Sequence, residues 1–382
     1  MAGAPATEYG VLADAVYERD AVGFVHVARP RDPTMRYIAR VDGPRSRMAF
    51  VFVNGDALLV PPASHCDAAK RQFAGDAIVD PASLSGDGPG ERAAELLGDR
   101  ADPGTVLTPR HVPHDAALFL ERAGFDPAST EAVDRARETK SSAEIDRIRR
   151  VQRGAEAGVR VAAEVLAGAA VDGREIRDQG GSLTTGGLRR RVNAALAERG
   201  LEDAGNTVVA AGRAAASPRF GGDVPIRPGE PVIVDVTPRG GHGYHVDFAR
   251  TFVVDSDGGW DRRAHVAVEQ ALQAGIDAVE PGASPATVHR AVAGEIRSFG
   301  FPADRSRDVG FVHDAVHGVG LARREAPSVS GGPLEPGHVL AVEAGVYDPA
   351  EGGVRLEEPV VVGTDGVRRT TEATRSLEPA ER

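Results

Sequence analysis

Short blocks of apolar and polar residues alternate over the first 130 residues of the chain. The periodicity predicts helices at 8–19, 67–73 and 114–124. Short apolar runs typical of strands lie at 22–28, 47–53, 57–62, 77–80 and 105–109. Asn54-Gly55-Asp56 is a tight-turn sequence between two of these runs and favours a hairpin. The alternation of the two element types predicts a small α/β domain.

The hydrophobic pattern changes near residue 139, where a long amphipathic helix begins. Its sequence is TKSSAEIDRIRRVQRGAEAGVRVAAEVLAG, and Ser142 is the predicted N-cap. The glycine-rich stretch 179–187 breaks the next helical pattern and is predicted to be an exposed loop. Further helices are predicted at 188–199, 261–280 and 285–299. A chain of 382 residues is long enough for two domains, and we place their boundary between 138 and 139.

The composition is that of a globular protein in water, with 41% hydrophobic and 26% charged residues. A net charge of -11 disfavours nucleic acid and anionic membranes, so a small molecule or a short peptide is the expected partner. Cys66 is the single cysteine, which excludes an intramolecular disulfide and a thiolate zinc cluster. The chain shows neither the pattern of a secretory signal peptide nor a membrane span, which predicts a cytoplasmic protein.

Acidic residues interrupt the two strands predicted in PVIVDVTPRGGHGYHVDFARTFVV. The first strand, 232–236, is almost entirely β-branched, which predicts burial on both faces. Asp235 at its end therefore needs a cation or several hydrogen-bond donors, because an unpaired buried carboxylate is costly. Alternation along the second strand places His245 and Asp247 on one face. Two facing carboxylates on a hairpin attract a hard cation.

One histidine and two more acidic strands follow near the C-terminus. His317 stands in VHGVGL, where flanking glycine lets a metal or backbone approach closely. The apolar strands VLAVEAGVY and GVRLEEPVVV carry Glu343 and Glu357. Each acid alone could equally be a turn former or a partner for an arginine. Together, four carboxylates and one imidazole form an oxygen-rich ligand set that suits manganese, iron or cobalt, and zinc in a binuclear site.

These motifs resemble those of the creatinase/prolidase/aminopeptidase P family, which shares its catalytic pita-bread domain with methionine aminopeptidases. The matching motifs are VIVDV, GYHVDFARTF, VHGVGL, AVEAGVY and GVRLEE. The segment RARETKSSAEIDRIR resembles the start of the family's catalytic domain, and TMRYIARVDGPRSRMAFVFV is similar to part of its smaller N-terminal domain. The resemblance implies an α/β (α+β) chain with a ribonuclease-H-like domain over 1–138, a pita-bread domain over 139–382, and a homodimer.

The resemblance also implies a set of metal ligands. Asp235 would bind one of two divalent ions, and His317 and Glu343 the other. Asp247 and Glu357 would bridge the pair. Manganese is the first expectation, with cobalt, zinc or iron as alternatives. In this family pattern a hydroxide shared by the two ions attacks the scissile amide, and Glu343 carries its proton to the leaving amine.

Several residues around these ligands are candidates for substrate binding or support. Arg355 would orient the acids or form an ordinary strand-surface salt bridge, and His313 fits one substrate-contacting histidine of the family. Arg219 and Arg324 replace two other such histidines, which removes general-acid chemistry there but leaves hydrogen-bond donors. The two arginines would grip an anionic group of the substrate, or point to solvent and pair with acids. Tyr347 is predicted to line the pocket or simply to pack.

Three functions follow from these patterns. The first is a metal-dependent Xaa-Pro aminopeptidase or Xaa-Pro dipeptidase, indicated by the complete ligand set. The second keeps the fold and metals but acts on a small carboxylate-bearing amide or amidine that is not a peptide, as the two arginines suggest. The third is a non-catalytic binding module related to peptidases, which the intact ligand set disfavours.

Overall fold

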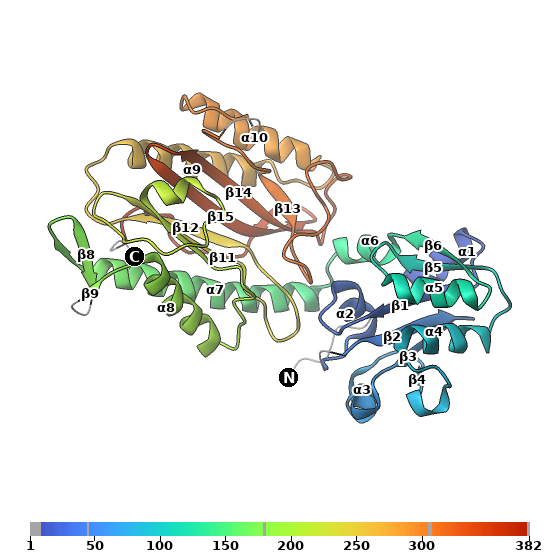
Figure 1. Cartoon of the computed structure of the whole chain (residues 1–382). Helices are drawn as coiled ribbons and strands as arrows, with labels where there is room; N and C mark the ends of the chain where they lie inside the picture. Colours follow the sequence, from blue (N-terminus) through green and yellow to red (C-terminus); the bar gives the residue numbers. More distant parts are fainter. Residues whose placement is uncertain (1–8, 44–45, 179–180, 305–307, 380–382) are drawn as a thin grey trace. The chain divides into compact units, whose positions relative to one another are not determined.

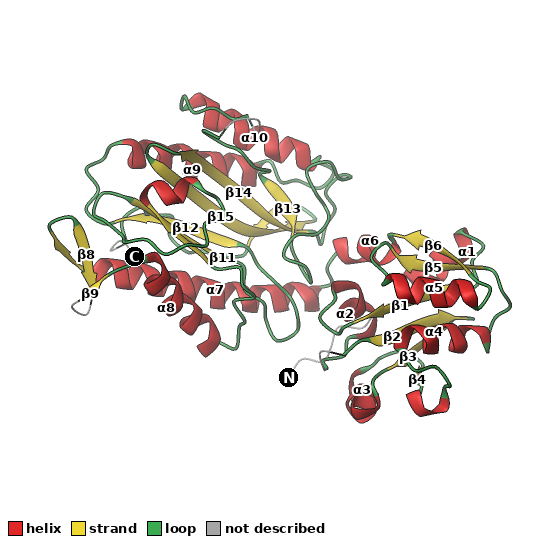
Figure 2. Cartoon of the chain, viewed as in Figure 1, coloured by secondary structure: helices red, strands yellow, loops and turns green. Residues whose placement is uncertain are grey.

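The computed structural model describes residues 9–43, 46–178, 181–304 and 308–379. The chain divides into two compact units, Met1–Arg137 and Glu138–Arg382. Each unit combines helices with its own sheet (Figure 2), and each is described by itself below.

A six-stranded mixed sheet forms the centre of the N-terminal unit (Figure 1). Its strands, in the order β4-β3-β2-β1-β5-β6, are β1 (Gly23–Ala28), β2 (Met48–Val53), β3 (Asp56–Val60), β4 (Ala77–Ile78), β5 (Thr105–Pro109) and β6 (Asp126–Thr130). Its helices are α1 (Gly10–Glu18), α2 (Pro33–Ala39), α3 (Cys66–Gln72), α4 (Pro89–Gly98), α5 (His114–Arg122) and α6 (Ala132–Glu138), with short 3-10 turns η1 (Ala63–His65) and η2 (Pro81–Ser83). The strands β1, β2 and β3 run antiparallel, whereas β4, β5 and β6 run parallel to their neighbours.

The central strands of this sheet are buried on both faces, which explains their continuous apolar runs. Phe24 and Phe50 belong to one hydrophobic cluster, and Val25 and Val51 belong to another. Successive residues of a strand point to opposite faces, so each strand supplies both clusters. The predicted hairpin is confirmed, since β2 and β3 pair around a two-residue loop.

A seven-stranded antiparallel sheet forms the centre of the C-terminal unit. Its path is β10-β11-β12-β15-β14-β13, with β16 paired to β15. The strands are β10 (Val208–Ala211), β11 (Pro231–Val236), β12 (Phe248–Val253), β13 (Val316–Gly318), β14 (Val339–Asp348), β15 (Gly352–Gly363) and β16 (Gly366–Arg369). A small second sheet contains β7 (Ala170–Asp172), β8 (Glu175–Asp178) and β9 (Gly181–Ser182).

Among the described residues, four helices and one 3-10 turn complete the C-terminal unit. They are α7 (Ser142–Gly168), α8 (Thr185–Glu198), η3 (Gly212–Ala216), α9 (Trp260–Asp277) and α10 (Pro285–Ser298). Helix α7 contacts β11 and β12, and α9 contacts β14 and β15 and packs against α10 (Figure 1). The helices and the strands β11, β14 and β15 follow the sequence prediction closely, whereas β12 begins later than predicted, at Phe248, so that His245 and Asp247 precede it.

Two local predictions differ from the structure. The N-cap of α7 is Ser141 rather than Ser142, because Glu144 accepts a hydrogen bond from the Ser141 backbone N–H at 2.9 Å and completes a capping box. In the predicted loop 179–187, residues 179–180 lie outside the described residues. The prediction is wrong for the remainder, since β9 and the first turn of α8 occupy it. Thr184 caps α8 through the Gly187 N–H at 3.1 Å, so glycine starts this helix instead of breaking it.

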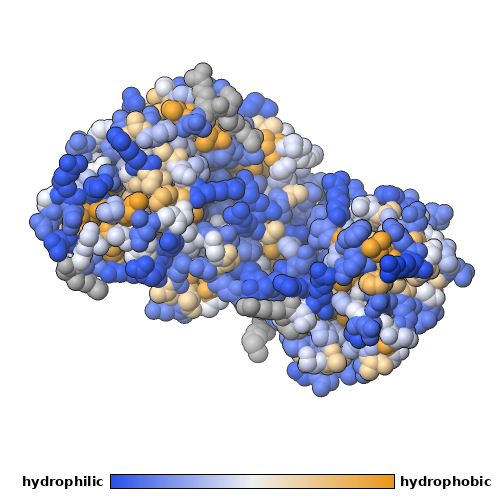
Figure 3. Space-filling view, viewed as in Figure 1, coloured by the Kyte–Doolittle hydropathy of each residue, from blue (hydrophilic) through white to orange (hydrophobic). Residues whose placement is uncertain are grey.

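The surface is mainly hydrophilic in the face that Figure 3 shows, with hydrophobic residues in small separate patches. Within the described parts of the chain, the exposed large hydrophobic residues are Tyr17, Val171, Val266 and Val309. We find no helix among these residues with the length and apolar character that a membrane crossing requires.

Candidate metal centre

The pairing register of the C-terminal sheet brings three acids into one row. Asp235 on β11 is paired with Ala249 on β12, and Ala249 is paired with Glu357 on β15. Glu357 is in turn paired with Glu343 on β14. Directly paired residues point to the same face with Cβ atoms about 4.5–5.5 Å apart. The row therefore presents three carboxylates on one face, with Ala249 between two of them.

Asp247 and His317 complete this arrangement from two neighbouring elements. Asp247 directly precedes β12, two residues before Ala249, and His317 lies on β13 at the end of the sheet path. His317 Nε2 is 2.6 Å from Glu343 Oε1 and 3.5 Å from Asp247 Oδ2. The five predicted ligands thus meet at one place in the structure.

The ligand atoms form two overlapping groups of three. One group contains Asp235, Asp247 and Glu357, and the other contains Asp247, His317 and Glu343. Within each group the ligand atoms lie within 4.8 Å of one another. Asp247 belongs to both groups, as expected of a residue that bridges two ions.

The burial of these side chains tests whether they fit a divalent metal. All five ligands are buried, and none is more than 8% exposed. Glu357 Oε2 has no hydrogen-bond partner among the described residues. Buried polar atoms nearly always have hydrogen-bond partners, and a bound ion is one explanation where they do not. The residues present therefore fit divalent metal ions.

The ionisation of the acidic and histidine side chains in the centre also fits bound divalent ions. Burial and the carboxylates of Asp247 and Glu343 raise the pKa of Asp235 to about 7, although Arg355 opposes the change. Burial and three neighbouring acids, Asp235, Asp247 and Glu343, also raise the pKa of Glu357 well above its usual range. Burial alone would lower the pKa of His317, but Glu343 and Asp247 raise it to about 10. Without cations, so many acids in a dry site hold protons, which metal ions displace on binding.

Arg355 lies among these acids and is buried. Its Nη1 donates to Asp235 Oδ2 at 2.5 Å and to the Pro218 carbonyl at 3.2 Å, while its Nε donates to the Tyr347 hydroxyl at 2.7 Å. Its Nε is also 3.5 Å from Glu357 Oε1. The guanidinium shares its donors among several partners and is not a surface salt bridge. Each contact restrains a residue of the centre.

His313 is held by hydrogen bonds on both ring nitrogens. Nδ1 donates to the Asp314 carbonyl at 2.8 Å and lies 3.4 Å from Glu343 Oε2. Because Nδ1 carries the proton, Nε2 accepts from the Tyr347 hydroxyl at 3.1 Å. Burial lowers the pKa of His313 to about 4, so its ring is neutral near pH 7. Tyr347 is fully buried between His313 and Arg355, which favours a positioning role over the predicted substrate contact.

The two arginines predicted to bind substrate are placed differently. Arg324 Nη1 is 3.7 Å from Glu343 Oε1, and its side chain is 40% exposed, so it contacts both the centre and solvent. Arg219 is exposed, and it follows Pro218, whose carbonyl binds Arg355. Arg324 therefore has the direct contact with the centre.

One residue of the centre was absent from the sequence prediction. Thr237 Oγ1 donates to Asp247 Oδ1 at 2.9 Å, and both side chains are buried. Thr237 follows Asp235 by two residues in the same hairpin, so the signal was its position beside a predicted ligand. The hydrogen bond orients the carboxylate that both ligand groups share.

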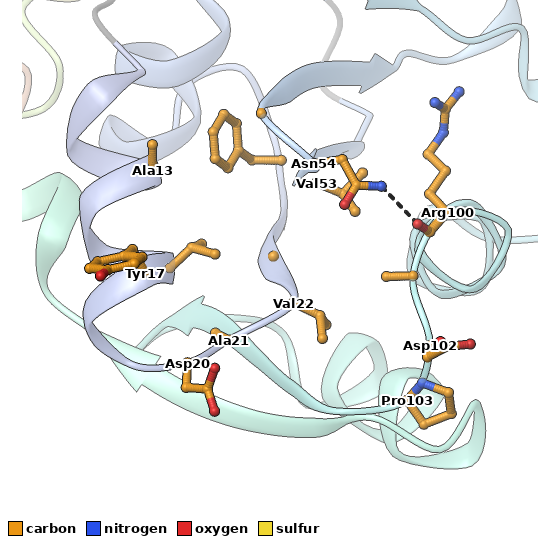
Figure 4. A pocket seen from close by; sticks show the side chains of 15 residues that line it. Ala13, Tyr17, Asp20, Ala21, Val22, Val53, Asn54, Arg100, Asp102 and Pro103 are labelled. Carbon is orange, nitrogen blue, oxygen red and sulfur yellow. Dashed lines mark hydrogen bonds between the residues drawn. The ribbon is translucent and has the colours of Figure 1, made fainter.

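A surface hollow of the N-terminal unit has a different character (Figure 4). It is lined by the end of α1, the start of β1, the turn between β2 and β3, and the loop before β5. The side chain of Asn54 donates to the Arg100 carbonyl across it at 2.8 Å. None of the predicted site residues lines this hollow.

Comparison with known proteins decides the family. Residues 146–364, more than half of the chain, match Metallopeptidase family M24. The chain belongs to this family. The predicted membership of the creatinase/prolidase/aminopeptidase P group is therefore confirmed, and with it an enzyme that uses divalent metal. The non-peptide hydrolase and the non-catalytic module are not favoured.

Two relatives illustrate the match in sequence. The chain is 28% identical over 292 residues to the probable dipeptidase PepE of Mycobacterium tuberculosis, which covers 74% of this chain and 72% of the relative. It is 32% identical over 203 residues to the Xaa-Pro dipeptidase of Pyrococcus furiosus, and this match covers 50% of this chain and 56% of the relative. The match to the Mycobacterium tuberculosis relative is longer than the M24 region and therefore extends beyond it.

Solved structures extend the likeness to the whole fold. The Xaa-Pro dipeptidase from Bacillus anthracis has a TM-score of 0.84 at 20% identity, and the match covers 97% of this chain and 98% of that one. The dipeptidase PepE from Mycobacterium ulcerans has a TM-score of 0.76 at 25% identity, covering 96% and 95%. The predicted combination of a small N-terminal domain with a pita-bread catalytic domain is confirmed.

Proposed function

We propose that this M24 enzyme is an Xaa-Pro dipeptidase or Xaa-Pro aminopeptidase with a binuclear metal centre. The observation that carries the proposal is the pair of overlapping ligand groups that share Asp247. The similarity to relatives such as the Pyrococcus furiosus Xaa-Pro dipeptidase supports the choice of substrate. Manganese is the first metal to test, followed by cobalt, zinc and iron, because an oxygen-rich set with one imidazole accepts all four.

Each of the five ligands has its own role in this proposal. Asp235, Asp247 and Glu357 would hold one ion, and Asp247, His317 and Glu343 would hold the other. Bound divalent ions supply Lewis-acid stabilisation of the oxyanion and lower the pKa of water. Glu343 accepts the proton of the attacking water and delivers it to the leaving amine, for which a carboxylate beside the reacting atoms is suited.

The surrounding residues keep this geometry. Arg355 fixes the Asp235 carboxylate, and Tyr347 fixes His313 in the tautomer with the proton on Nδ1. That proton points toward both the Asp314 carbonyl and Glu343, so His313 helps to orient the acid that moves the proton. A neutral histidine in this role leaves Glu343 free to take up a proton.

Arg324 supplies a positive charge at the border between the centre and solvent. Guanidinium binds carboxylates with directed hydrogen bonds and stays charged at every working pH. We therefore propose that Arg324 binds the terminal carboxylate of a dipeptide substrate. Arg219, which is exposed, is a second candidate for this contact. The homodimer and the cytoplasmic location predicted from the sequence remain proposals that sedimentation and cell fractionation would test.

The test is a peptide panel run on metal-loaded protein. Purified enzyme is loaded separately with manganese, cobalt, zinc or iron and offered Xaa-Pro dipeptides and Xaa-Pro-Yaa tripeptides. We expect release of the N-terminal residue, and loss of that release in Asp247→Asn, which weakens both ligand groups. Asp255→Asn, an exposed change on the same hairpin, is the matched control. No cleavage of any such peptide with any of the four metals would contradict the proposal.

A further inference from the structure

Three side chains of metal-ligating type meet in the N-terminal unit, outside the centre described above. His26 lies on β1, Asp32 precedes α2 as its N-cap, and His111 lies in the loop after β5. The strands β1 and β5 are parallel neighbours, so the segments that follow them start from the same end of the two strands. We call these three residues the His-Asp-His cluster.

The carboxylate of Asp32 stands between the two imidazoles. Its Oδ1 is 2.9 Å from His26 Nε2, and its Oδ2 is 3.1 Å from His111 Nε2. One ligand atom from each of the three residues lies within 4.8 Å of the others. A tetrahedral zinc ion with bonds of about 2.0–2.1 Å holds its ligand atoms about 3.4 Å apart. Small side-chain adjustments would therefore bring all three atoms to one ion.

Helix capping accounts for Asp32 but not for the histidines. Asp32 Oδ1 accepts from the Met35 N–H at 2.9 Å, and asparagine or serine at this position would cap α2 as well. Neither His26 nor His111 is needed for that cap. A carboxylate with one imidazole at each oxygen calls for a further explanation.

The burial of His26 strengthens the case for a bound ion. Its side chain is 0% exposed within the apolar strand GFVHVA, where a polar ring is costly unless its nitrogens are satisfied. Nε2 of His26 faces Asp32, whereas Nδ1, the other ring nitrogen, has no hydrogen-bond partner among the described residues. Asp32 and His111 have side chains 19% and 48% exposed, which leaves the cluster open to ions from solvent.

We propose that His26, Asp32 and His111 bind a divalent transition-metal ion of the zinc class. Two imidazole nitrogens and one carboxylate oxygen are ligands that suit zinc, and water would fill the remaining position. The ion would join β1, the start of α2 and the loop after β5. This site is separate from the peptidase centre and does not depend on the proposed function.

Zinc stoichiometry of the full-length protein tests the proposal. The protein is stripped with a chelator, equilibrated with excess zinc, desalted and submitted to elemental analysis. We expect His111→Ala to hold one zinc equivalent fewer than the wild type. His114→Ala removes another exposed histidine three residues away and should keep the wild-type content. Asp32→Asn retains a side-chain acceptor for the helix cap and should lose the same equivalent as His111→Ala.

A second measurement locates the ion. Zinc should protect His111, but not His114, from acylation by diethyl pyrocarbonate, as read by peptide mass spectrometry. Equal zinc content in the wild type and His111→Ala, together with unprotected His111, would overturn the proposal. Neither measurement uses peptidase activity, so an inactive peptidase would not affect the result.

Discussion

Arg250 donates a hydrogen bond from Nη1 to the backbone carbonyl of Glu357 at 3.2 Å. The same nitrogen donates to the Ala249 carbonyl at 3.0 Å, and Nη2 donates to Glu358 Oε1 at 2.9 Å. Among the described residues, the ladder between β12 and β15 consists of the single pair Ala249–Glu357. Arg250 therefore reinforces, from the opposite face of the sheet, the junction that bears Asp247 and Glu357.

Removal of this guanidinium should weaken both the fold and the metal centre. In Arg250→Ala the buried carboxylate of Glu358 loses one partner, and breaking a buried ion pair costs roughly 3–5 kcal/mol. Because Arg375 and Arg369 still contact Glu358, we expect the lower end of that range. Urea unfolding and metal titration would measure the two effects. Arg368→Ala, an exposed arginine of the same sheet, should change stability by less than about 0.5 kcal/mol, and an equal loss in both variants would refute this role of Arg250.

Arg324→Gln should impair dipeptides more than their amides. The variant removes a charge-assisted hydrogen bond worth about 1.5–3 kcal/mol, which corresponds to an increase in KM of roughly 10–100-fold. Xaa-Pro dipeptides with a free carboxylate are compared with the same peptides as C-terminal amides. Arg323→Gln changes the exposed neighbour and should leave both values unaltered. An equal increase in KM for the dipeptides and for their amides would show that Arg324 does not recognise the carboxylate.

Tyr347→Phe should reduce kcat while metal content stays constant. The change deprives the Arg355 Nε of its acceptor and His313 of its donor, without altering the size of the ring. Outer contacts of this kind affect activity by roughly 10–100-fold. The measurement is kcat with elemental analysis of the same preparation. Tyr17→Phe, at a tyrosine that is 88% exposed, is the control, and a variant with wild-type kcat would exclude the positioning role.

Metal removal should destabilise the protein by a predictable amount. The centre holds four carboxylates whose charges a cation neutralises, so the folded state binds the ion far more strongly than the unfolded chain. At a free metal concentration of 100 times Kd, one site adds about 2.7 kcal/mol to the free energy of unfolding. Thermal unfolding with manganese and after chelation would measure the difference. Asp247→Asn should respond weakly to added metal, and an unchanged midpoint in the wild type would argue against the centre.

The sequence predicted the strands of the centre because each ligand interrupts a strongly apolar run. Asp235, Glu343 and Glu357 all lie on predicted strands, and the register of those strands could be inferred only from the family resemblance. The predicted N-cap of α7 was wrong by one residue because two serines are adjacent in the sequence. The three-residue spacing from Ser141 to Glu144, which is that of a capping box, identifies the correct one.

Contacts between distant segments escaped sequence analysis. Arg250 and Glu357 are 107 residues apart, and nothing local to either residue indicates their hydrogen bond. His26 was likewise hidden within an apolar run, and its partner His111 lies in a loop without a pattern. The helices α2 and α4, of seven and ten residues, were not predicted from the sequence.

Ala249 is the smallest side chain in the row that runs from Asp235 to Glu343, and it lies between two acids on the face where the ligands meet. Its methyl group places little bulk between these acids. A valine at this position would keep every ligand and every motif, yet would add two carbon atoms on the face where the ligands meet. We therefore expect the small size of this one side chain to matter to metal binding as much as the ligands themselves.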